Sequence, residues 1–306
     1  MTQRKDQTIF VTGASTGIGR ATVLRLASQG HPVYASARKP ENLAALNAVK
    51  GVTAVPLDVR APEQVLAAVE KVRESGSGLY GLVNNAGVGG IGPIASFTDD
   101  EVRDLFETNV FGVFRMTREF LPLLLESRGR IILVGSQGGS ISMKYYAPYT
   151  MTKHALEAFV VALDLEIRPH GARAAIVQPG GVITAIGDNS QAADWDRFAR
   201  APAPFDQEAR DIAATLGLPS TDSFDPSLPE SATNRNPSPP EAVAEAIQEA
   251  LDSPSPRLRT LVGTRWEGHR VLDALMEKLA QANACPSLRY SREELIQRLE
   301  GFLKQN

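Results

Sequence analysis

Short β-rich runs alternate with helical patterns from the start of the chain to Gly180. "TIFVTG" precedes a helical stretch at residues 18–29, and the apolar run "RIILVGS" precedes a helix that begins near Tyr149. The other predicted strands are "HPVYASA", "VTAVPLDV", "GLVNNAG" and "ARAAIVQPG". Parallel strands need helical crossovers, and these pack on both faces of the sheet. We therefore predict an α/β fold, a Rossmann-type doubly wound parallel sheet with helices on both faces.

The pattern changes after Gly180. Residues 201–240 hold eight of the chain's 20 prolines, which predicts an irregular segment with one helix near residues 207–216 and no strand. A helix at 241–251, a strand in "LRTLVG" and helices at 269–280 and 292–303 complete the chain. We expect a single catalytic domain over residues 1–306, with a substrate-lid insertion at 185–240 and a C-terminal helical extension at 264–306.

Composition and charge exclude several classes of protein. Apolar residues make up 43% and charged residues 22%, as in ordinary soluble proteins. A formal charge of −3 gives no basic field for nucleic acid. No apolar run approaches the roughly 20 residues of a membrane span, and no signal peptide is recognisable. Cys285 is the only cysteine, which excludes an internal disulfide and favours a reducing compartment. We predict a cytoplasmic protein with no metal site.

A glycine-rich loop stands between the first strand and the first helix. In "VTGASTGIG" the spacing is Gly-x-x-x-Gly-x-Gly. Glycines permit a tight turn and a close approach of backbone to ligand, and a helix N-terminus favours a pyrophosphate. The alternative is a tight turn with no ligand. The position after the first strand favours dinucleotide binding, with these loop residues at the cofactor: Gly13, Ser15, Thr16, Gly17, Ile18 and Gly19.

The end of the second strand indicates which dinucleotide is bound. Sites specific for NAD usually carry an acid there, which bonds the ribose 2′-hydroxyl. In this chain the stretch is "YASARK", with Ser36 and Ala37 in place of an acid and Arg38 beside them. A guanidinium suits a 2′-phosphate, which a carboxylate would repel. We predict NADP(H); the alternative is that Arg38 is only a solvated loop residue.

Tyr149 and Lys153 lie four residues apart in "YTMTK", a spacing that places both on one face of a helix. A free tyrosine, with a pKa of about 10, is a poor base at neutral pH. A neighbouring ammonium favours phenolate, so we predict a lowered pKa that lets Tyr149 exchange a proton with an alcohol or ketone. Ser136, after a strand, could hold the substrate oxygen as charge develops on it. Each part alone is common by chance.

Together these motifs resemble the classical short-chain dehydrogenases/reductases in order and spacing. The resemblance covers roughly residues 7–185 and rests on the glycine loop, "NNAG", Asn109, Ser136, "YTMTK" and "PGGVIT". It implies a catalytic tetrad of Asn109, Ser136, Tyr149 and Lys153, in which the tyrosine is the acid/base and the asparagine supports a proton-relay water. It also implies that Tyr149 and Lys153 contact the cofactor together with Asp58, Val59, Asn85, Ala86, Gly87, Pro179, Gly180, Val182 and Thr184. Tyr145 and Tyr146 have no lysine at this offset and are expected to shape the substrate side of the cleft.

Other stretches narrow the substrate class. "VYASARKPENL", "LVNNAGVGGIGPI" and "SPRLRTLVG" resemble the branch of hydroxysteroid and retinol dehydrogenases, which implies a small, lipid-like carbonyl or secondary-alcohol substrate. The predicted lid mixes charged residues with apolar ones, which counts against a purely apolar tunnel; the apolar ones are Ile186, Trp195, Phe198, Phe205 and Ile212. Two alternatives stay open: a catalytically silent NADP(H)-binding sensor or scaffold, and an epimerase or dehydratase of the extended relatives. The first class commonly lacks the tyrosine or the lysine, and the second needs a longer C-terminal half.

The family commonly pairs its subunits through two helices, here around residues 99–125 and 149–167. Both stretches carry more apolar residues than one buried stripe requires, including Phe106, Phe111, Phe114, Phe159 and Val160. The resemblance therefore implies a homodimer or homotetramer. On the second helix we expect His154 to have a packing or surface role and Asp164 to lie on the polar face. Near the C-terminus we expect Cys285 to be a partly buried, inert thiol.

Overall fold

A computed structural model describes residues 7–184, 186–216, 227–231 and 234–304 of the chain. Its centre is a parallel sheet of seven strands in the order β3-β2-β1-β4-β5-β6-β7. The strands are β1 (Ile9–Val11), β2 (Val33–Ala37), β3 (Val52–Pro56), β4 (Gly81–Asn84), β5 (Arg130–Val134), β6 (Arg173–Pro179) and β7 (Arg259–Val262). The predicted fold class is confirmed, including the edge strand in "LRTLVG".

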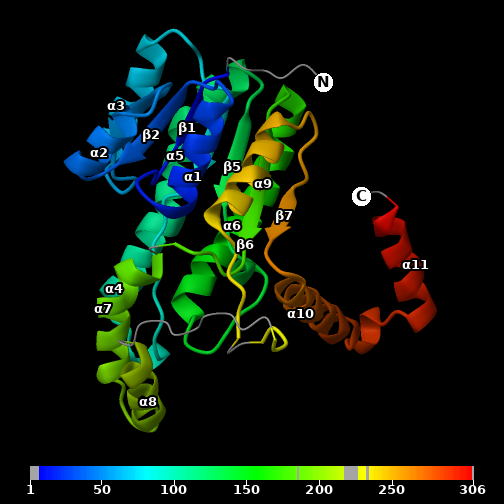
Figure 1. The fold of residues 1–306 in the computed structure, drawn as a ribbon. Coiled ribbons are helices and arrows are strands. Elements are labelled where there is room, and N and C mark those ends of the chain that lie inside the picture. Colours follow the sequence, from blue (N-terminus) through cyan, green and yellow to red (C-terminus); the bar gives the residue numbers. More distant parts are fainter. Residues whose placement is uncertain (1–6, 185, 217–226, 232–233, 305–306) are drawn as a thin grey trace.

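Helices cover both faces of the sheet, each with its own apolar core (Figure 1). One face packs against α3 (Pro62–Glu74), α5 (Gly112–Glu126) and α6 (Ala147–Ile167). The other packs against α1 (Gly17–Ser28), α2 (Pro40–Asn47) and α9 (Pro240–Asp252). Strands buried on both faces are apolar throughout, which is why "RIILV" shows no alternation.

A longer helical stretch runs from below the carboxyl ends of the strands onto one face of the sheet (Figure 1). It begins with α4 (Asp99–Phe106), where Thr98 and Glu101 form the predicted capping box. It continues through a π-helical turn, η2 (Glu107–Phe111), into α5. Short 3₁₀ turns occur elsewhere in the described ranges: η1 (Ile94–Ser96), η3 (Gln137–Gly139), η4 (Arg168–His170) and η5 (Pro286–Leu288).

The predicted lid is more helical than the sequence indicates. The helix expected near 207–216 is α8 (Asp206–Leu216), but a second helix, α7 (Ile186–Ala199), precedes it. The two pack together and enclose a small core of Phe198, Ala209 and Ala213. Both lie beneath the carboxyl ends of the strands, next to α4 (Figure 1). Residues 185, 217–226 and 232–233 of the predicted lid lie outside the described residues.

The C-terminal extension consists of α10 (Arg265–Asn283) and α11 (Arg292–Leu303), and α11 stands apart from the sheet (Figure 1). Cys285, between them, is exposed, so the expected partial burial of its thiol is wrong. The expectation for Asp164 is also wrong, since it is fully buried on α6. Its carboxylate accepts hydrogen bonds from Arg173 Nε at 2.9 Å and from Ala174 N at 2.9 Å, which links the end of α6 to β6.

Candidate active site

The glycine loop lies where the strand order reverses. β1 and β4 are neighbours, although the chain first runs outward from β1 to β3. A ligand crevice forms at such a point in a doubly wound sheet. Gly13 follows β1 with a φ of +63°, and a Cβ there would stand 2.8 Å from Ala86 Cα. Only glycine fits this close approach between the two loops.

The loop after β4 fixes the glycine loop in place. The Asn85 side-chain amide donates to Thr12 O and Gly13 O, each at 2.9 Å. In return, Thr12 Oγ1 accepts hydrogen bonds from the backbone N–H groups of Asn85 and Ala86. The side chain of Asn85 therefore holds the cradle together, and its contribution to a cofactor site is indirect.

The cradle ends in an anion-binding geometry. Thr16 is the N-cap of α1 with an extended backbone, and the first turn of α1 carries no acid. The N–H groups of this turn can therefore meet an anion, which the helix dipole favours. Gly17 abuts Thr184, so the segment after β6 closes the crevice from the other side. Pro179 ends β6, Gly180 and Val182 follow it, and Val182 pairs with Ser238 in a parallel bridge.

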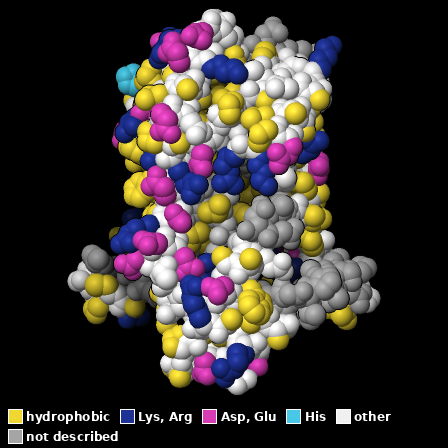
Figure 2. Space-filling model, turned by 90° about the vertical axis from the view of Figure 1, so that its left-hand side faces the viewer, with side chains coloured by type: hydrophobic (Ala, Val, Ile, Leu, Met, Phe, Trp, Pro, Cys, Tyr) yellow, Lys and Arg dark blue, Asp and Glu magenta, His cyan; other side chains and the backbone are white. Residues whose placement is uncertain are grey.

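Arg38 follows β2 and faces the loop after β3. Its Nη1 is 4.0 Å from Asp58 Oδ2, while Arg60 Nη2 holds the same oxygen at 2.9 Å. Burial would raise the pKa of Asp58, but hydrogen bonds from Arg60 outweigh it and keep that pKa below its usual value. Arg60 thus neutralises Asp58, and the Arg38 side chain stays 67% exposed. On the face at the left of Figure 1, Lys and Arg side chains form a band across the middle (Figure 2).

Three of the predicted catalytic residues converge at the carboxyl end of β5. Ser136 lies two residues beyond the strand, and its Oγ accepts a hydrogen bond from Gly138 N at 3.0 Å. Tyr149 is in the first turn of α6 and hydrogen-bonds with Ser136. Lys153 stands on the next turn of the same helix face. Its Nζ donates to Val134 O at 3.1 Å.

The acid–base balance of this cluster differs from the prediction. Burial lowers the pKa of Lys153 to about 8. Enclosure also raises the pKa of Tyr149, and the hydrogen bond with Ser136 only partly opposes this. The expected depression of the Tyr149 pKa is therefore wrong for this state, because desolvation dominates and the Lys153 ammonium, 5.7 Å from the ring centre, does not offset it. Tyr149 is consequently a phenol at neutral pH.

Asn109 lies in the π-helical turn and is fully buried. Its Oδ1 accepts from Val88 N at 2.8 Å, and its Nδ2 donates to Val88 O and Thr152 Oγ1. The side chain therefore joins the β4 loop to α6. A Cβ on Gly87 would meet Asn109 Oδ1 at 3.3 Å and Lys153 Nζ at 3.9 Å, so the four predicted catalytic residues do belong to one region. π-bulges occur often at functional sites.

A cleft of about 420 Å³ opens beside Ser136 and Tyr149. Tyr146 lines it as expected, but Tyr145 does not. Tyr145 instead packs edge-on against Phe198 of α7, with ring centres 5.2 Å apart, because its backbone adopts a φ of 70°. His154 Nδ1 lies 2.9 Å from Thr150 O, a local contact within α6.

The predicted lid segment is clamped by charged groups to the loop after β4 and to α4. Arg197 donates to Ile91 O at 2.9 Å and to Glu101 Oε1 at 3.0 Å, and it pairs with Asp194. Arg200 Nη2 reaches Glu101 Oε2 at 2.6 Å. Burial would raise the pKa of Glu101, but these hydrogen bonds and those from Thr98 lower it to about 2. The charged residues of the lid are thus used in anchoring it.

Sequence reasoning missed two cleft residues beyond the lid helices. Arg235 and Arg270 line the cleft, and Arg235 pairs with the buried Glu267 at 2.6 Å. Glu267 also accepts from Gly181 N at 2.7 Å, beside the end of β6. The sequence does contain a signal for the start of α10, the capping box of Thr264 and Glu267. Arg270 follows Glu267 by three residues on this helix. In the described part of the chain, no group of His, Cys, Asp and Glu could hold a metal ion.

Comparisons with known proteins agree on one family. Residues 7–195 match the model of short chain dehydrogenases. The chain is 32% identical to the uncharacterized oxidoreductase YbbO of Escherichia coli strain K12, over 83% of this chain and 84% of that protein. Two solved structures share 29% identity with it. A short-chain dehydrogenase from Streptomyces avermitilis gives a TM-score of 0.70 over 92% of this chain and 95% of the other. A variant of actinorhodin polyketide ketoreductase with NADPH gives 0.69 over 86% and 98%. None of the helices in the described ranges has the length and apolar content for crossing a membrane.

Proposed function

The chain belongs to the short-chain dehydrogenase family, and we propose that it transfers hydride between NADP(H) and a carbonyl compound or secondary alcohol. The observation that carries this proposal is the Ser136–Tyr149–Lys153 cluster, in which Ser136 and Tyr149 line the cleft and Lys153 is buried behind them. A catalytically silent binding protein would not need a phenol, a hydroxyl and a buried ammonium at one place, since a buried lysine costs stability.

The glycine loop and the start of α1 have the hydrogen-bond donors and the open backbone that a dinucleotide needs. The first turn of α1 offers backbone N–H groups to a pyrophosphate, and Gly13 brings the two loops into close approach. When bound, NADP(H) supplies or accepts the hydride. We assign the pyrophosphate to the Gly13–Gly19 loop, the adenine to Asp58 and Val59, and the nicotinamide side to Gly87 and to residues 179–184.

The chain's own residues handle the proton. In the direction of reduction, Tyr149 donates its phenolic proton to the carbonyl oxygen as the hydride arrives, and its raised pKa keeps that proton in place at neutral pH. Ser136 orients the same oxygen through its hydroxyl. The Lys153 ammonium donates a hydrogen bond to Val134 O. In this position its positive charge lies near the developing phenolate of Tyr149. Asn109 braces the loop and helix that carry these groups.

A preference for NADP(H) is part of this proposal. Arg38 stands at the end of β2 and is largely exposed, and Asp58, the nearest acid, is already held by Arg60. A guanidinium that is not committed to an acid can meet a 2′-phosphate with charge-assisted hydrogen bonds. The actinorhodin polyketide ketoreductase variant was solved with NADPH, which supports the same choice for this chain.

We also propose a lipid-like substrate, as the resemblance to hydroxysteroid and retinol dehydrogenases implies. The apolar walls of the cleft support this, and they consist of Ile91, Ile141, Met143, Val182 and Ile186. The substrate lid at residues 185–240 and the cytoplasmic location are likewise part of this proposal.

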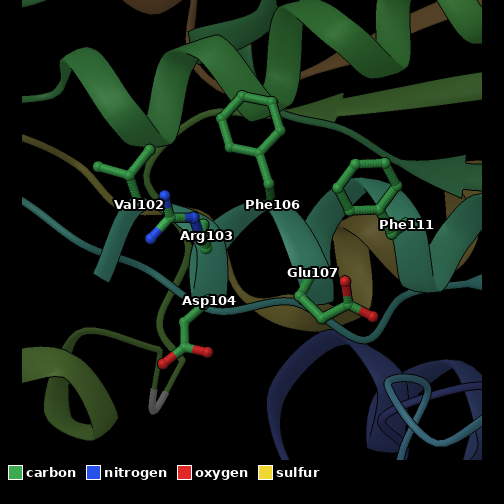
Figure 3. Close-up of a pocket in the computed structure, with 6 residues that line it drawn as sticks. All are labelled: Val102, Arg103, Asp104, Phe106, Glu107 and Phe111. Carbon is green, nitrogen blue, oxygen red and sulfur yellow. The ribbon is translucent and has the colours of Figure 1, made fainter. Parts of the chain in front are cut away.

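Assembly into a dimer or tetramer is proposed through the outer faces of α4, α5 and α6. Phe111 and Phe114 are 51% and 47% exposed, and Phe114 packs edge-on against Phe159 of α6 at 6.1 Å. Beside them is a depression of about 440 Å³, where the rings of Phe106 and Phe111 lie on one side and the carboxylates of Asp104 and Glu107 point away (Figure 3). Val160 is fully buried, so its predicted place in the interface is wrong: it faces the sheet.

The test of the proposed activity is a screen of ketones and secondary alcohols with NADPH or NADP, read by absorbance of the reduced cofactor. We expect cofactor-dependent turnover of at least one ketone class, with NADPH preferred over NADH. Tight NADPH binding with no turnover of any carbonyl or alcohol would favour the sensor or scaffold alternative.

A further inference from the structure

One charged group in the cleft has no role in the proposed reaction. Arg270 comes from α10, far in sequence from Ser136 and Tyr149, yet it lines the same cleft. It lies beyond residues 7–195, the part that matches the family model. Arg270 and Trp266, over which it stacks, therefore come from the C-terminal extension, whereas its other contact, Met143, comes from the matched part.

The other charges that line the cleft are compensated. Asp194 pairs with Arg197, and both are buried. Arg235 Nη2 lies 2.6 Å from Glu267 Oε1, so the side chain is committed to a buried carboxylate. Within the described residues, Arg270 has no carboxylate within 4.0 Å. Among the described residues that line the cleft, Arg270 is therefore the one charged group without a countercharge.

The surroundings of Arg270 hold the group without neutralising it. Its guanidinium stacks over the ring of Trp266, 4.8 Å from the ring centre, and Nη2 donates to Met143 Sδ at 3.0 Å. A thioether is a weak acceptor, and an aromatic face leaves the edge of the guanidinium free. A planar fork of donors held by stacking matches the two oxygens of a carboxylate or the oxygens of a phosphate.

The position separates this cation from the cofactor phosphates. The pyrophosphate is assigned to the Gly13–Gly19 loop and the 2′-phosphate to Arg38, and none of these residues lines the cleft. Arg270 contacts Met143, which precedes Tyr146 on the substrate wall. An anion at Arg270 would thus belong to the substrate.

We propose that Arg270 is a specificity-determining residue that binds an anionic group of the substrate. This rests on the proposed function, and it narrows the substrate to a carbonyl or hydroxyl compound with an apolar body and a carboxylate or phosphate at one end. Ser136 and Tyr149 meet the reacting oxygen, the apolar walls hold the body, and the guanidinium holds the acid. The same substrate class accounts for a cleft whose described lining combines apolar walls with one uncompensated cation.

The experiment compares matched substrates that differ only in this charge. Keto acids of graded length are assayed against their methyl esters and against the corresponding keto phosphate monoesters, with saturating NADPH. We expect wild type to prefer one anionic series over the esters by about ten- to a hundredfold in kcat/KM, the effect of one charge-assisted contact. In Arg270→Gln this ratio should fall to near one, whereas Arg270→Lys, which keeps the charge, should retain part of it.

Arg265→Gln is the matched control, since Arg265 is exposed on the same helix and does not line the cleft. It should leave the ratio unchanged. A binding arm uses calorimetry of the same acids with the NADPH-loaded protein, and Arg270→Gln should weaken their binding by a similar factor. Equal use of acids and esters by wild type, or an unchanged ratio in Arg270→Gln, would overturn the inference while the proposed reaction stands. If wild type turns over no carbonyl, the proposed function fails, and calorimetry alone decides whether Arg270 binds the anion.

Discussion

Lys153 and Tyr149 share one face of α6, with the Lys153 ammonium 5.7 Å from the centre of the Tyr149 ring and hydrogen-bonded to Val134 O at 3.1 Å. The lysine is therefore fixed to the sheet rather than to the phenol. Its burial lowers the pKa of Lys153, and the enclosure of Tyr149 raises the pKa of the phenol. Both pKa values are shifted in the direction that disfavours the charged form of the group. Burial of the charged lysine therefore costs folding free energy, and this cost can be measured.

Lys153→Met should stabilise the protein at pH 7. The lysine pKa falls from 10.5 to about 8 on folding, which corresponds to about 3 kcal/mol against the charged form. Loss of the hydrogen bond to Val134 O returns about 1 kcal/mol, so we expect a net gain of about 1–2 kcal/mol. Because the folded pKa lies below the unfolded one, wild-type stability rises as pH increases from about 8 to 10.5.

The advantage of Lys153→Met should therefore shrink over this window and reverse before pH 10.5, because the burial cost of the lysine disappears while the lost hydrogen bond to Val134 O remains. Denaturant unfolding of both proteins between pH 7 and 10.5 measures the difference, in which other titrating groups cancel. A variant that is less stable than wild type at pH 7, with no dependence on pH, would contradict the burial cost assigned to Lys153.

Arg38→Ala should weaken NADPH binding and leave NADH binding almost unchanged, because NADH offers no 2′-phosphate. A charge-assisted contact contributes about 1.5–3 kcal/mol, which is roughly ten- to a hundredfold in affinity. The double variant Arg38→Ala/Ala37→Asp should weaken NADPH binding further, since a carboxylate repels the 2′-phosphate and accepts a hydrogen bond from the ribose hydroxyl of NADH. The measurement is the ratio of kcat/KM with the two cofactors. A wild type that prefers NADH, or a ratio unchanged in Arg38→Ala, would leave Arg38 as a solvated loop residue.

Glu101→Gln should loosen α7. Glu101 accepts hydrogen bonds from Arg197 on that helix and from Arg200 just after its end, and its side chain is 25% exposed. We expect a loss of about 1–2 kcal/mol in local stability, which speeds amide hydrogen exchange in α7 by about five- to thirtyfold at pH 7. Exchange in β4 and β5 should not change. Glu119→Gln, which breaks an exposed pair with Arg118, is the control. Unaltered exchange in α7 would show that the clamp does not hold the lid.

Replacing both Phe111 and Phe114 with serine should convert an oligomer into monomers, because these exposed rings lie on the proposed interface. Leu66→Ser is the matched control, since Leu66 is 54% exposed on α3, which is not one of the helices of the proposed interface. Sedimentation at micromolar concentration gives the mass of each protein. If wild type itself sediments as a monomer under these conditions, the proposed assembly is wrong.

The sequence predicted those parts of the molecule that depend on local pattern. The glycine loop, the apolar strands and the offset of Tyr149 from Lys153 all reflect spacing along one element, and each lies where it was expected. The helix α7 was missed because "IGDNSQAADWDRFA" has little apolar periodicity of its own. Its position depends on distant partners, since Arg197 and Phe198 contact Glu101 and Tyr145.

Contacts between distant parts of the chain also explain what the sequence did not predict within the site. Arg270 reaches Met143, 127 residues earlier in the chain, and no local pattern indicates such a pairing. The pKa of Tyr149 was predicted with the wrong sign, because spacing reveals the neighbouring ammonium but not the enclosure of the phenol. Desolvation depends on the whole cleft, so it could be assessed only once the fold was known.

The most direct test of this account is turnover by Tyr149→Phe, measured beside Tyr145→Phe, whose ring packs under α7 and does not line the cleft. General acid catalysis contributes about a hundred- to ten-thousandfold, so we expect ketone reduction by NADPH to fall at least that far in Tyr149→Phe. Affinity for NADPH should stay close to that of wild type, and Tyr145→Phe should keep most of its activity. Substantial turnover by Tyr149→Phe, with loss of activity in Tyr145→Phe, would contradict the assignment of Tyr149 as the acid.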